Sequence, residues 1–418
     1  MTSDLHGPLS RYAESLHATI GDRHHVASPL GAWLLLAIAG ATATEHPAAT
    51  GLAESLGTDL TGAAEVARAL LDAPHPLVAS ATALWYRPDQ GVHGPSGWRG
   101  ALPTTTEVGA LPDQAGLDAW ARARTLGLIE SFPMRVGPDV VLALASALAT
   151  RISWADPFEV ADGSALGAAS AWAGRLRRVL RSPGRGHRGA IATTARAGDV
   201  IVHTAPARTA DGAGLVVLSV AAAPQVPPTE VLAAAYQLSA DAADGAPPAG
   251  RRSLFDLPLG TGPLWTLREE RVRTGARDGR EERHSAVLPC WSARSEHDLT
   301  APALGFPAAS ATLAAALTLP VQDFEARQVA MARYGRYGFE AAAVTGMFGI
   351  TSMPPEGIAR TAELRFGHPY AVVAVATDRR ADGGTGPWHG VPVFSAWVTE
   401  PEELPEAEGT SNDAEEYS

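Results

Sequence analysis

The last third of the chain is rich in strand-forming segments that have few partners close by in the sequence. Apolar and β-branched runs predict strands at residues 287–291, 329–334, 370–376 and 391–399. The last two flank Asp382-Gly383-Gly384-Thr385-Gly386, a sequence typical of a hairpin turn with a longer loop. The other late strands must pair with strands far back in the chain, and no linker divides it. We therefore expect an α+β fold in one large interleaved domain.

The earlier part of the chain predicts a mixture of helices and strands. Helical patterns cover residues 9–20, 29–41 and 114–132, and Ser28 followed by Pro29 predicts the start of the second of these helices. Strand patterns cover residues 79–86, 140–153, 200–203 and 215–221, with 140–153 expected to be a buried central strand. Residues 240–282 have the weakest pattern. We expect the domain to span residues 1–401 and the acidic residues 402–418 to form a disordered tail.

Composition excludes several classes of protein. The chain carries 45 acidic against 33 basic residues, a net charge of −12, which argues against a general nucleic-acid binder. Its one cysteine, Cys290, rules out an intramolecular disulfide. The longest apolar run, residues 32–41, is too short to cross a membrane. Because the N-terminus lacks the pattern of a signal peptide, we expect a cytoplasmic protein and leave action outside the cell open.

A run of small residues between Gly338 and Thr345 suits both a loop and a strand. It reads Gly338-Phe339-Glu340-Ala341-Ala342-Ala343-Val344-Thr345. Three of these positions, Ala341, Ala343 and Thr345, alternate with the others in the period of a β-strand. The run leads on to a Pro354-Pro355 stop. A segment with these properties could move from one state to the other.

Seven short blocks, spread in order over nearly the whole chain, carry a resemblance to a known family. They are Val26-Ala27-Ser28-Pro29-Leu30; Ala81-Thr82-Ala83-Leu84-Trp85; Trp120 with Thr125, Gly127 and Ile129; Leu144 through Trp154-Ala155-Asp156-Pro157-Phe158; Leu288-Pro289 with Ser295 and Asp298-Leu299; Phe366-Gly367-His368-Pro369-Tyr370; and Val393-Phe394 with Glu400-Pro401. In this order they resemble the motifs of the serpin family, as in a bacterial-type member. The run from Gly338 resembles the hinge of the serpin reactive-centre loop. The resemblance implies a single domain with three β-sheets, about eight or nine helices and an exposed reactive-centre loop.

The resemblance also implies a mechanism, the suicide inhibition of a serine protease or of a cysteine protease. The protease cuts the loop, which then inserts as a new strand into sheet A and releases the energy of a metastable fold. Small side chains at Ala341, Ala342, Ala343 and Thr345 would enter a sheet with little clash, and Gly338 would serve as a pivot.

The bond that the protease would cut can be placed in two ways. Counting forward from Gly338 places it between Ser352 and Met353, whereas counting back from Pro354-Pro355 places it between Thr351 and Ser352. Either bait residue is small and polar. Such a residue favours an elastase-like or subtilisin-like protease over a trypsin-like one, which requires Arg or Lys.

Four further residues match the opening of sheet A by resemblance: Ser28, Ser146, Trp154 and Gln328. The chain departs from the family's pattern where Ser146 replaces an Asn, Gly31 a Ser and Gln328 a His. Ser and Gln can still form hydrogen bonds at these positions. At the hinge, Phe339 stands where Thr or Ser is favoured, and Arg336 where Glu is common. With these departures, the polar cluster must form its hydrogen bonds through different side chains. Phe339 must find an apolar pocket if the hinge inserts.

Other motifs give weaker indications. Residues 184–189 match GxGxxG but do not follow a strand, and the arginines between 175 and 188 are typical of an exposed face. His24-His25 lacks a third ligand at metal spacing. We therefore expect no catalytic residues, metal or cofactor, and a monomer whose partner is a protease. The alternatives are a non-inhibitory serpin-like binding protein whose loop is cut without insertion, and a hydrolase or nucleotide-binding enzyme, for which the sequence offers no convincing site.

Overall fold

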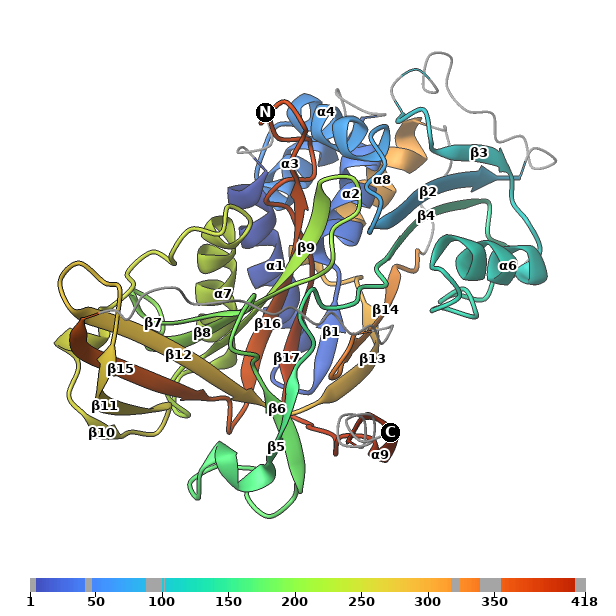
Figure 1. Ribbon diagram of the computed structural model, residues 1–418. Helices are drawn as coiled ribbons and strands as arrows, with labels where there is room; N and C mark the ends of the chain where they lie inside the picture. The colour runs from blue at the N-terminus through green and yellow to red at the C-terminus, as the bar shows by residue number, and fades with distance from the viewer. Residues whose placement is uncertain are drawn as a thin grey trace, which may run out of the picture.

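The computed structural model describes residues 5–41, 47–87, 100, 102–137, 139–316, 324–338 and 355–409. The α-helices are α1 (His6–Ile20), α2 (Pro29–Gly40), α3 (Ala48–Leu56), α4 (Leu60–Leu71), α6 (Gln114–Arg124), α7 (Pro228–Ala242), α8 (Phe306–Ala316) and α9 (Glu406–Gly409) (Figure 1). The strands are β1 (His25–Ala27), β2 (Ala79–Tyr86), β3 (Glu107–Ala110), β4 (Leu142–Ala149), β5 (Glu159–Asp162), β6 (Arg178–Arg181), β7 (Arg188–Thr194), β8 (Gly198–Pro206), β9 (Ala213–Ala221), β10 (Gly260–Thr261), β11 (Trp265–Arg273), β12 (Arg280–Leu288), β13 (Trp291–Asp298), β14 (Arg327–Tyr334), β15 (Glu356–Arg365), β16 (Tyr370–Asp378) and β17 (Pro392–Val398).

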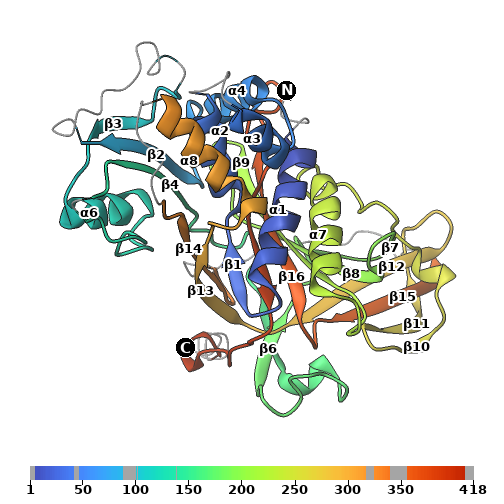
Figure 2. The ribbon, with the colours of Figure 1, turned by 180° about the vertical axis from the view of Figure 1, so that it is seen from behind.

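The first six-stranded sheet joins the two ends of the chain. Its strand order is β1-β17-β16-β9-β8-β7, and β1 pairs antiparallel with β17 so that His25 faces Trp397. The hairpin predicted from the glycine-rich turn is confirmed as β16 and β17. Helix α7 packs on this sheet, and its Val231 and Tyr236 share a buried cluster with Val220 (Figure 2). An early strand and a late hairpin therefore share one sheet, as an interleaved α+β domain requires.

The second six-stranded sheet has the order β10-β11-β15-β12-β6-β5 and contains strands that the sequence pattern did not predict. Strands β11 and β12 flank β15, which pairs antiparallel with β11 and parallel with β12. Their apolar pattern is interrupted by charged residues that pair across strands, such as Arg360 of β15 with Glu269 of β11 at 2.8 Å. Between this sheet and the first, residues 366–369 form the connection from β15 to β16.

The third sheet implied by the resemblance is present as two pieces in the described residues. One has the order β3-β2-β4, and the other is the antiparallel pair of β13 and β14. Both views place the two pieces next to each other (Figures 1 and 2). Strand β4 has β2 as its only described partner, and β14 has only β13, so each piece ends in an edge strand.

A helical core lies beside the two pieces. Helix α2 is apolar on all sides and almost wholly buried, in contact with α1, α3, α4 and α8. It begins where expected, because the Ser28 side chain accepts the N–H of Gly31 and Pro29 occupies a first-turn position. None of the described helices is long and apolar enough to cross a membrane.

Three predicted elements differ from the structure. The helix expected over 114–132 ends at Arg124, because Leu126 (φ 56°) and Gly127 (φ 76°) adopt left-handed backbone conformations. The strand expected over 140–153 is shorter, and in the described residues it is an edge strand rather than a central one. The strand expected over 287–291 is the junction of β12 and β13, which Pro289 separates.

The beginning of the expected tail is ordered. We expected residues 402–418 to be disordered, but residues 402–409 contact the domain, and Leu404 is buried in its core. Glu402 bridges to Cys290 through the backbone, and α9 follows. Residues 410–418 lie outside the described part of the chain. The ordered residues extend the domain beyond the predicted boundary at 401.

Candidate functional site

The structure describes only the first residue of the predicted hinge. Gly338 is described, whereas Phe339, Glu340, Ala341, Ala342, Ala343, Val344 and Thr345 lie outside the described residues. Thr351, Ser352 and Met353, which flank the two predicted cleavage positions, lie outside them as well. The described part of the site comprises the residues that lead into the loop and those around the opening of sheet A.

A polar cluster joins α2 to both pieces of the divided sheet. The side-chain amide of Gln328 on β14 pairs with the backbone of Ser28: Ser28 N–H donates to Gln328 Oε1 (2.9 Å), and Gln328 Nε2 donates to Ser28 O (2.8 Å). The Ser28 hydroxyl donates to Val393 O (2.9 Å). From the other piece, the Ser146 hydroxyl of β4 donates to Gly31 O (3.0 Å). The predicted residues Ser28, Ser146 and Gln328 are thus brought together around one helix terminus.

The geometry of this cluster explains how it tolerates its unusual residues. The side-chain amide of Gln328 hydrogen-bonds to Ser28 as a neighbouring strand would, because it offers one donor and one acceptor to the backbone of a single residue. Gly31 leaves room for this arrangement, since a Cβ there would lie 3.2 Å from Ser28 Oγ and 3.5 Å from Ser146 Oγ. The three side chains are neutral, so these contacts do not depend on pH. The cluster fastens β4 and β14 to α2 and leaves them unpaired with each other.

Trp154 lies where the chain leaving β14 meets the chain leaving β4. Its indole Nε1 donates to Gly335 O (2.9 Å), and its backbone N–H donates to Tyr337 O (3.2 Å). The indole is buried and packs against Phe158 and Tyr334, with ring centroids 5.8 Å and 5.0 Å away. The resemblance had placed Trp154 near the entry of the hinge, and its contacts reach to one residue before Gly338.

Gly338 is held by close packing. Its backbone forms a bridge to Ser153 and has a φ of +80°. A Cβ at this position would lie 2.3 Å from Ile152 O, closer than two such atoms can approach. Only glycine fits here, for its conformation and for its lack of a side chain. The sequence suggested glycine at position 338 for its backbone freedom. The structure adds a second reason, the lack of space for a side chain, which the sequence does not reveal.

A cavity of about 770 Å³ lies between the two edge strands. Its wall includes residues 142–148 of β4 and 326–329 of β14, together with parts of α2, α6 and α8. Both strands present an edge to this space, and an unpaired strand edge is a template for the addition of another strand. Outside the cavity wall, the bonds from Trp154 to Tyr337 and between Ser153 and Gly338 join the chain that follows β4 to the chain that follows β14.

Trp120 on α6 belongs to the site, although the sequence had identified it only as part of a family-like motif. It lines the cavity, and its Nε1 is buried without a hydrogen-bond partner in the described part of the chain. Trp120 packs edge-on against Trp85, with ring centroids 5.1 Å apart. A buried donor without a partner is costly, and here it belongs to a side chain in the cavity wall. Only the position of the tryptophan, and not its missing partner, could have been read from the sequence.

A network of buried histidines joins the N-terminal elements to the first sheet. His17 Nδ1 and His25 Nε2 share a hydrogen bond of 2.7 Å, and His17 Nε2 bonds Ser395 Oγ at 2.7 Å. His297 Nε2 donates to Val26 O (2.7 Å), close to His25. Burial lowers the pKa of His25 to about 4 and holds the pKa of His17 well below 6.5. The described residues contain no group of side chains suited to a metal ion.

Three of the arginines between 175 and 188 have partners among the described residues. Arg178 and Arg181 pair with Glu403 and Glu363, and Arg188 donates to Gly245 O. The GxGxxG match at 184–189 lies between strands β6 and β7 and opens no helix. The GxGxxG match therefore lacks the strand-to-helix context of a dinucleotide-binding site.

Comparisons with solved structures agree with this architecture. The native thermophilic serpin Tengpin superposes with a TM-score of 0.61 at 12% identity, over 96% of this chain and 94% of that one. Human thyroxine-binding globulin in complex with thyroxine gives 0.59 at 14% identity, over 96% and 100%. Serpin48 from the insect Tenebrio molitor gives 0.58 at 12% identity, over 96% and 99%. No protein-family model and no curated protein matches the sequence. With the divided sheet, the polar cluster at the N-terminus of α2 and the packed glycine before the loop, these superpositions establish that the chain has the serpin fold.

Proposed function

We propose that the chain is a suicide inhibitor of a serine or cysteine protease, and that it acts by insertion of its cleaved loop between β4 and β14. The observation that carries the proposal is the cavity of about 770 Å³ between these two edge strands. An extended segment entering this space would provide hydrogen-bond partners for both edges at once. The segment that begins at Gly338 follows β14, one of these two strands, and contains the small residues that such entry requires.

The target class follows from the bait residues. Thr351 or Ser352 would occupy the specificity pocket of the attacking protease, depending on which of the two bonds is cut. Both side chains are small and polar, which suits elastase-like and subtilisin-like enzymes and leaves the acidic pocket of a trypsin-like enzyme unfilled. The partner we propose is therefore a protease of one of these two kinds.

A non-inhibitory role is the second candidate, because the fold is shared with a ligand carrier. Human thyroxine-binding globulin, which superposes with this chain, was solved in complex with thyroxine. In this alternative the loop is cut without insertion, and the cavity between the sheet pieces has another use. The large aromatic Phe339 at the second position of the hinge bears on this choice, because it would be among the first residues to enter the sheet and needs an apolar pocket there.

Incubation with each protease distinguishes the two candidates. The intact chain is mixed with an elastase-like or a subtilisin-like enzyme and run on a denaturing gel. A covalent adduct of inhibitor and protease that survives SDS supports inhibition. Complete cleavage near residue 350 without any adduct, at every ratio of chain to protease, supports the non-inhibitory candidate.

A further inference from the structure

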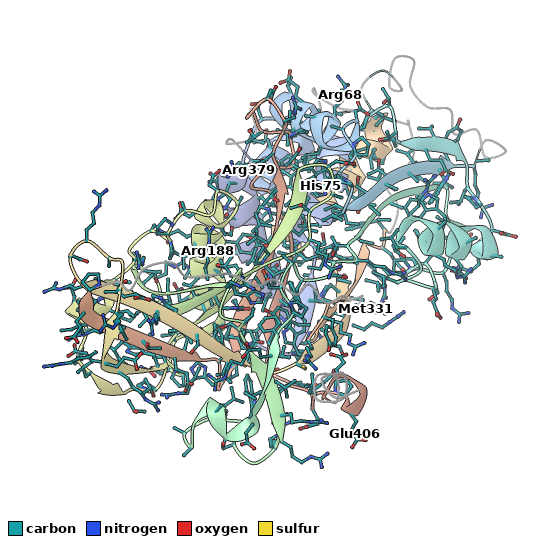
Figure 3. The ribbon with its side chains drawn as sticks, viewed as in Figure 1. Arg68, His75, Arg188, Met331, Arg379 and Glu406 are labelled. Atoms are coloured by element: carbon teal, nitrogen blue, oxygen red, sulfur yellow. The ribbon has the colours of Figure 1, made fainter. Side chains whose placement is uncertain are left out.

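The acidic segment 402–409, which follows the last strand, lies across the residues that lead into the loop. We name this segment the strap. Figure 3 places Glu406 of α9 on the same side of the molecule as Met331 of β14. Residue 409 is also the last residue that the structure describes, so the strap is the final described segment of the chain.

The first anchor of the strap binds the backbone of the only cysteine. Glu402 N–H donates to Cys290 O (2.7 Å), and the Glu402 carboxylate accepts the hydroxyl of Ser292. Cys290 is 4% exposed. Burial, together with the nearby carboxylates of Glu408, Glu402 and Glu403, raises the pKa of its thiol to about 12. The strap is therefore bonded to the backbone of a residue whose thiol is buried, and reaction of that thiol can report on local opening.

The second anchor holds the middle of the strap against β6. Glu403 accepts the backbone N–H of Arg177 (2.7 Å) and lies 3.7 Å from the guanidinium of Arg178. Arg178 also donates to Leu404 O (3.3 Å), while the Leu404 side chain is buried in the core. The strap is thus fixed by charge and by apolar packing between its two ends.

The third anchor reaches the base of the loop. The Glu408 carboxylate accepts from the guanidinium of Arg333 (2.8 Å) and from the backbone N–H of Arg336 (3.1 Å). The Arg336 guanidinium, only 7% exposed as a residue, donates to Glu408 O and to Phe158 O (3.1 Å). A buried guanidinium must have such partners, because desolvation without them is costly. Here the strap supplies one of the carbonyls and a carboxylate beside it.

The chain at residues 336 and 337 is therefore bound by two different segments. Phe158 N–H donates to Arg336 O (3.0 Å) and Trp154 N–H to Tyr337 O (3.2 Å), which fixes residues 336 and 337 to the segment after β4. Glu408 fixes residue 336 to the strap. For a strand to enter between β4 and β14, the first set of bonds must break. The strap opposes any movement of Arg336 that would break them.

We infer that the strap is a built-in restraint on the base of the loop, with Glu408 as the positioning residue that ties the C-terminal segment to Arg333 and Arg336. It sets how readily residues 335–338 leave the segment after β4. The inference rests on the proposed function for the use made of the loop, but the restraint itself can be measured without any protease.

Thiol labelling of the intact chain tests the restraint. Modification of Cys290 by a chromogenic disulfide reagent is followed at neutral pH in the original chain, in Glu408→Gln and in Glu402→Gln. The matched control is Glu296→Gln, which removes one ion pair, with Arg327 at 2.9 Å, from the opposite end of the same β13–β14 pair. We expect labelling to rise at least about fivefold in both strap variants and to stay within twofold in the control.

Salt and a double variant separate a local opening from general instability. The original chain in 1 M NaCl should be labelled faster, because the Debye length shrinks to about 3 Å and weakens the strap's ion pairs. Arg333→Ala added to Glu408→Gln should raise labelling no further, since both remove the same contact. Equal labelling in the original chain, both strap variants and the control, with no effect of salt, overturns the inference. Faster labelling of strap variants that form no adduct with any protease supports the strap and counts against the proposed inhibition, whereas adduct formation with unchanged labelling does the reverse.

Discussion

Gln328 and Ser28 are joined by two hydrogen bonds of opposite direction. Through them the amide side chain on β14 pairs with both the N–H and the C=O of the residue that caps α2. Replacing Gln328 by Ala leaves a buried N–H and a buried C=O without these partners. We expect a loss of about 1–3 kcal/mol in the free energy of unfolding. Gln328→Glu keeps the acceptor and loses the donor, so it should also destabilise. Chemical denaturation followed by circular dichroism measures both, and an unchanged midpoint for Gln328→Ala would contradict the assignment.

Insertion of the loop predicts a strong effect of position within the hinge. Ala343→Arg should leave folding intact and abolish inhibition, because the inserted strand would bury an unpaired charge at a cost of several kcal/mol. Ala342→Arg, which alternation places on the opposite face, is the matched control and should still form adducts. Adduct yield per protease is read from denaturing gels. Full yield for Ala343→Arg would sink the insertion hypothesis.

Energy stored in the intact chain should be released by a cut in the loop. A single cleavage between Gly346 and Met353 should raise the melting temperature if the loop becomes a central strand. Melting of the uncut chain should depend on scan rate, since it is controlled kinetically. Differential scanning calorimetry before and after verified cleavage measures both effects. Identical melting of the two forms would assign the chain to the non-inhibitory candidate.

Phe339 gives a prediction whose sign distinguishes two physical effects. If an apolar pocket receives its ring on insertion, Phe339→Thr should form less adduct, because burial of Phe contributes about 1.5–3 kcal/mol that Thr cannot match. If the ring instead slows entry, the same variant should form more. We predict the first result, on the ground that apolar burial helps to drive insertion. Titration of a fixed amount of protease gives the stoichiometry of inhibition, and an improved value for Phe339→Thr would show the prediction to be wrong.

The buried histidines predict a loss of stability in mild acid. The pKa of His17 lies well below its ordinary 6.5 and that of His25 is about 4, so both are neutral in the folded chain but protonated after unfolding below pH 6.5. The unfolded chain then binds more protons, and stability falls as the pH drops from about 6.5 towards about 4. His17→Gln should reduce this dependence, whereas the half-buried neighbour His24→Gln serves as a control. Melting temperatures at pH values from 8 to 4 measure this pH dependence of stability. Parallel curves of melting temperature against pH for the original chain and His17→Gln would contradict its assignment to the buried histidine.

The sequence predicted those parts of the fold that rest on local pattern. The capped start of α2 at Ser28-Pro29 and the β16–β17 hairpin are confirmed, because side-chain capping and turn chemistry are local. Strand β11 was missed, since the charged residues that interrupt its apolar pattern find their partners only on a distant strand. The end of α6 was placed too late, because a left-handed turn at a non-glycine residue, Leu126, has no clear sequence signal.

The candidate site could be predicted in its membership but not in its contacts. Resemblance identified Ser28, Ser146 and Gln328. The pair of hydrogen bonds between Gln328 and Ser28, however, joins two elements that lie 300 residues apart in the sequence. Arg336 was noted as a departure, but its partner lies in a tail expected to be disordered. A short acidic segment has a composition typical of disorder, but here complementary arginines on the domain and the burial of Leu404 hold it in place. The remaining hinge residues, from Phe339 to Thr345, and the two cleavage positions stay predictions.

The close packing at Gly338 defines where this protein can be re-engineered. Because a Cβ there would lie 2.3 Å from Ile152 O, the position accepts no residue other than glycine. Foreign loop sequences should therefore be grafted from residue 339 onward, up to the Pro354-Pro355 pair, as a cassette of fixed length. A graft that begins even one residue earlier would have to reproduce the glycine, or it would disturb the scaffold before the new bait sequence met any protease.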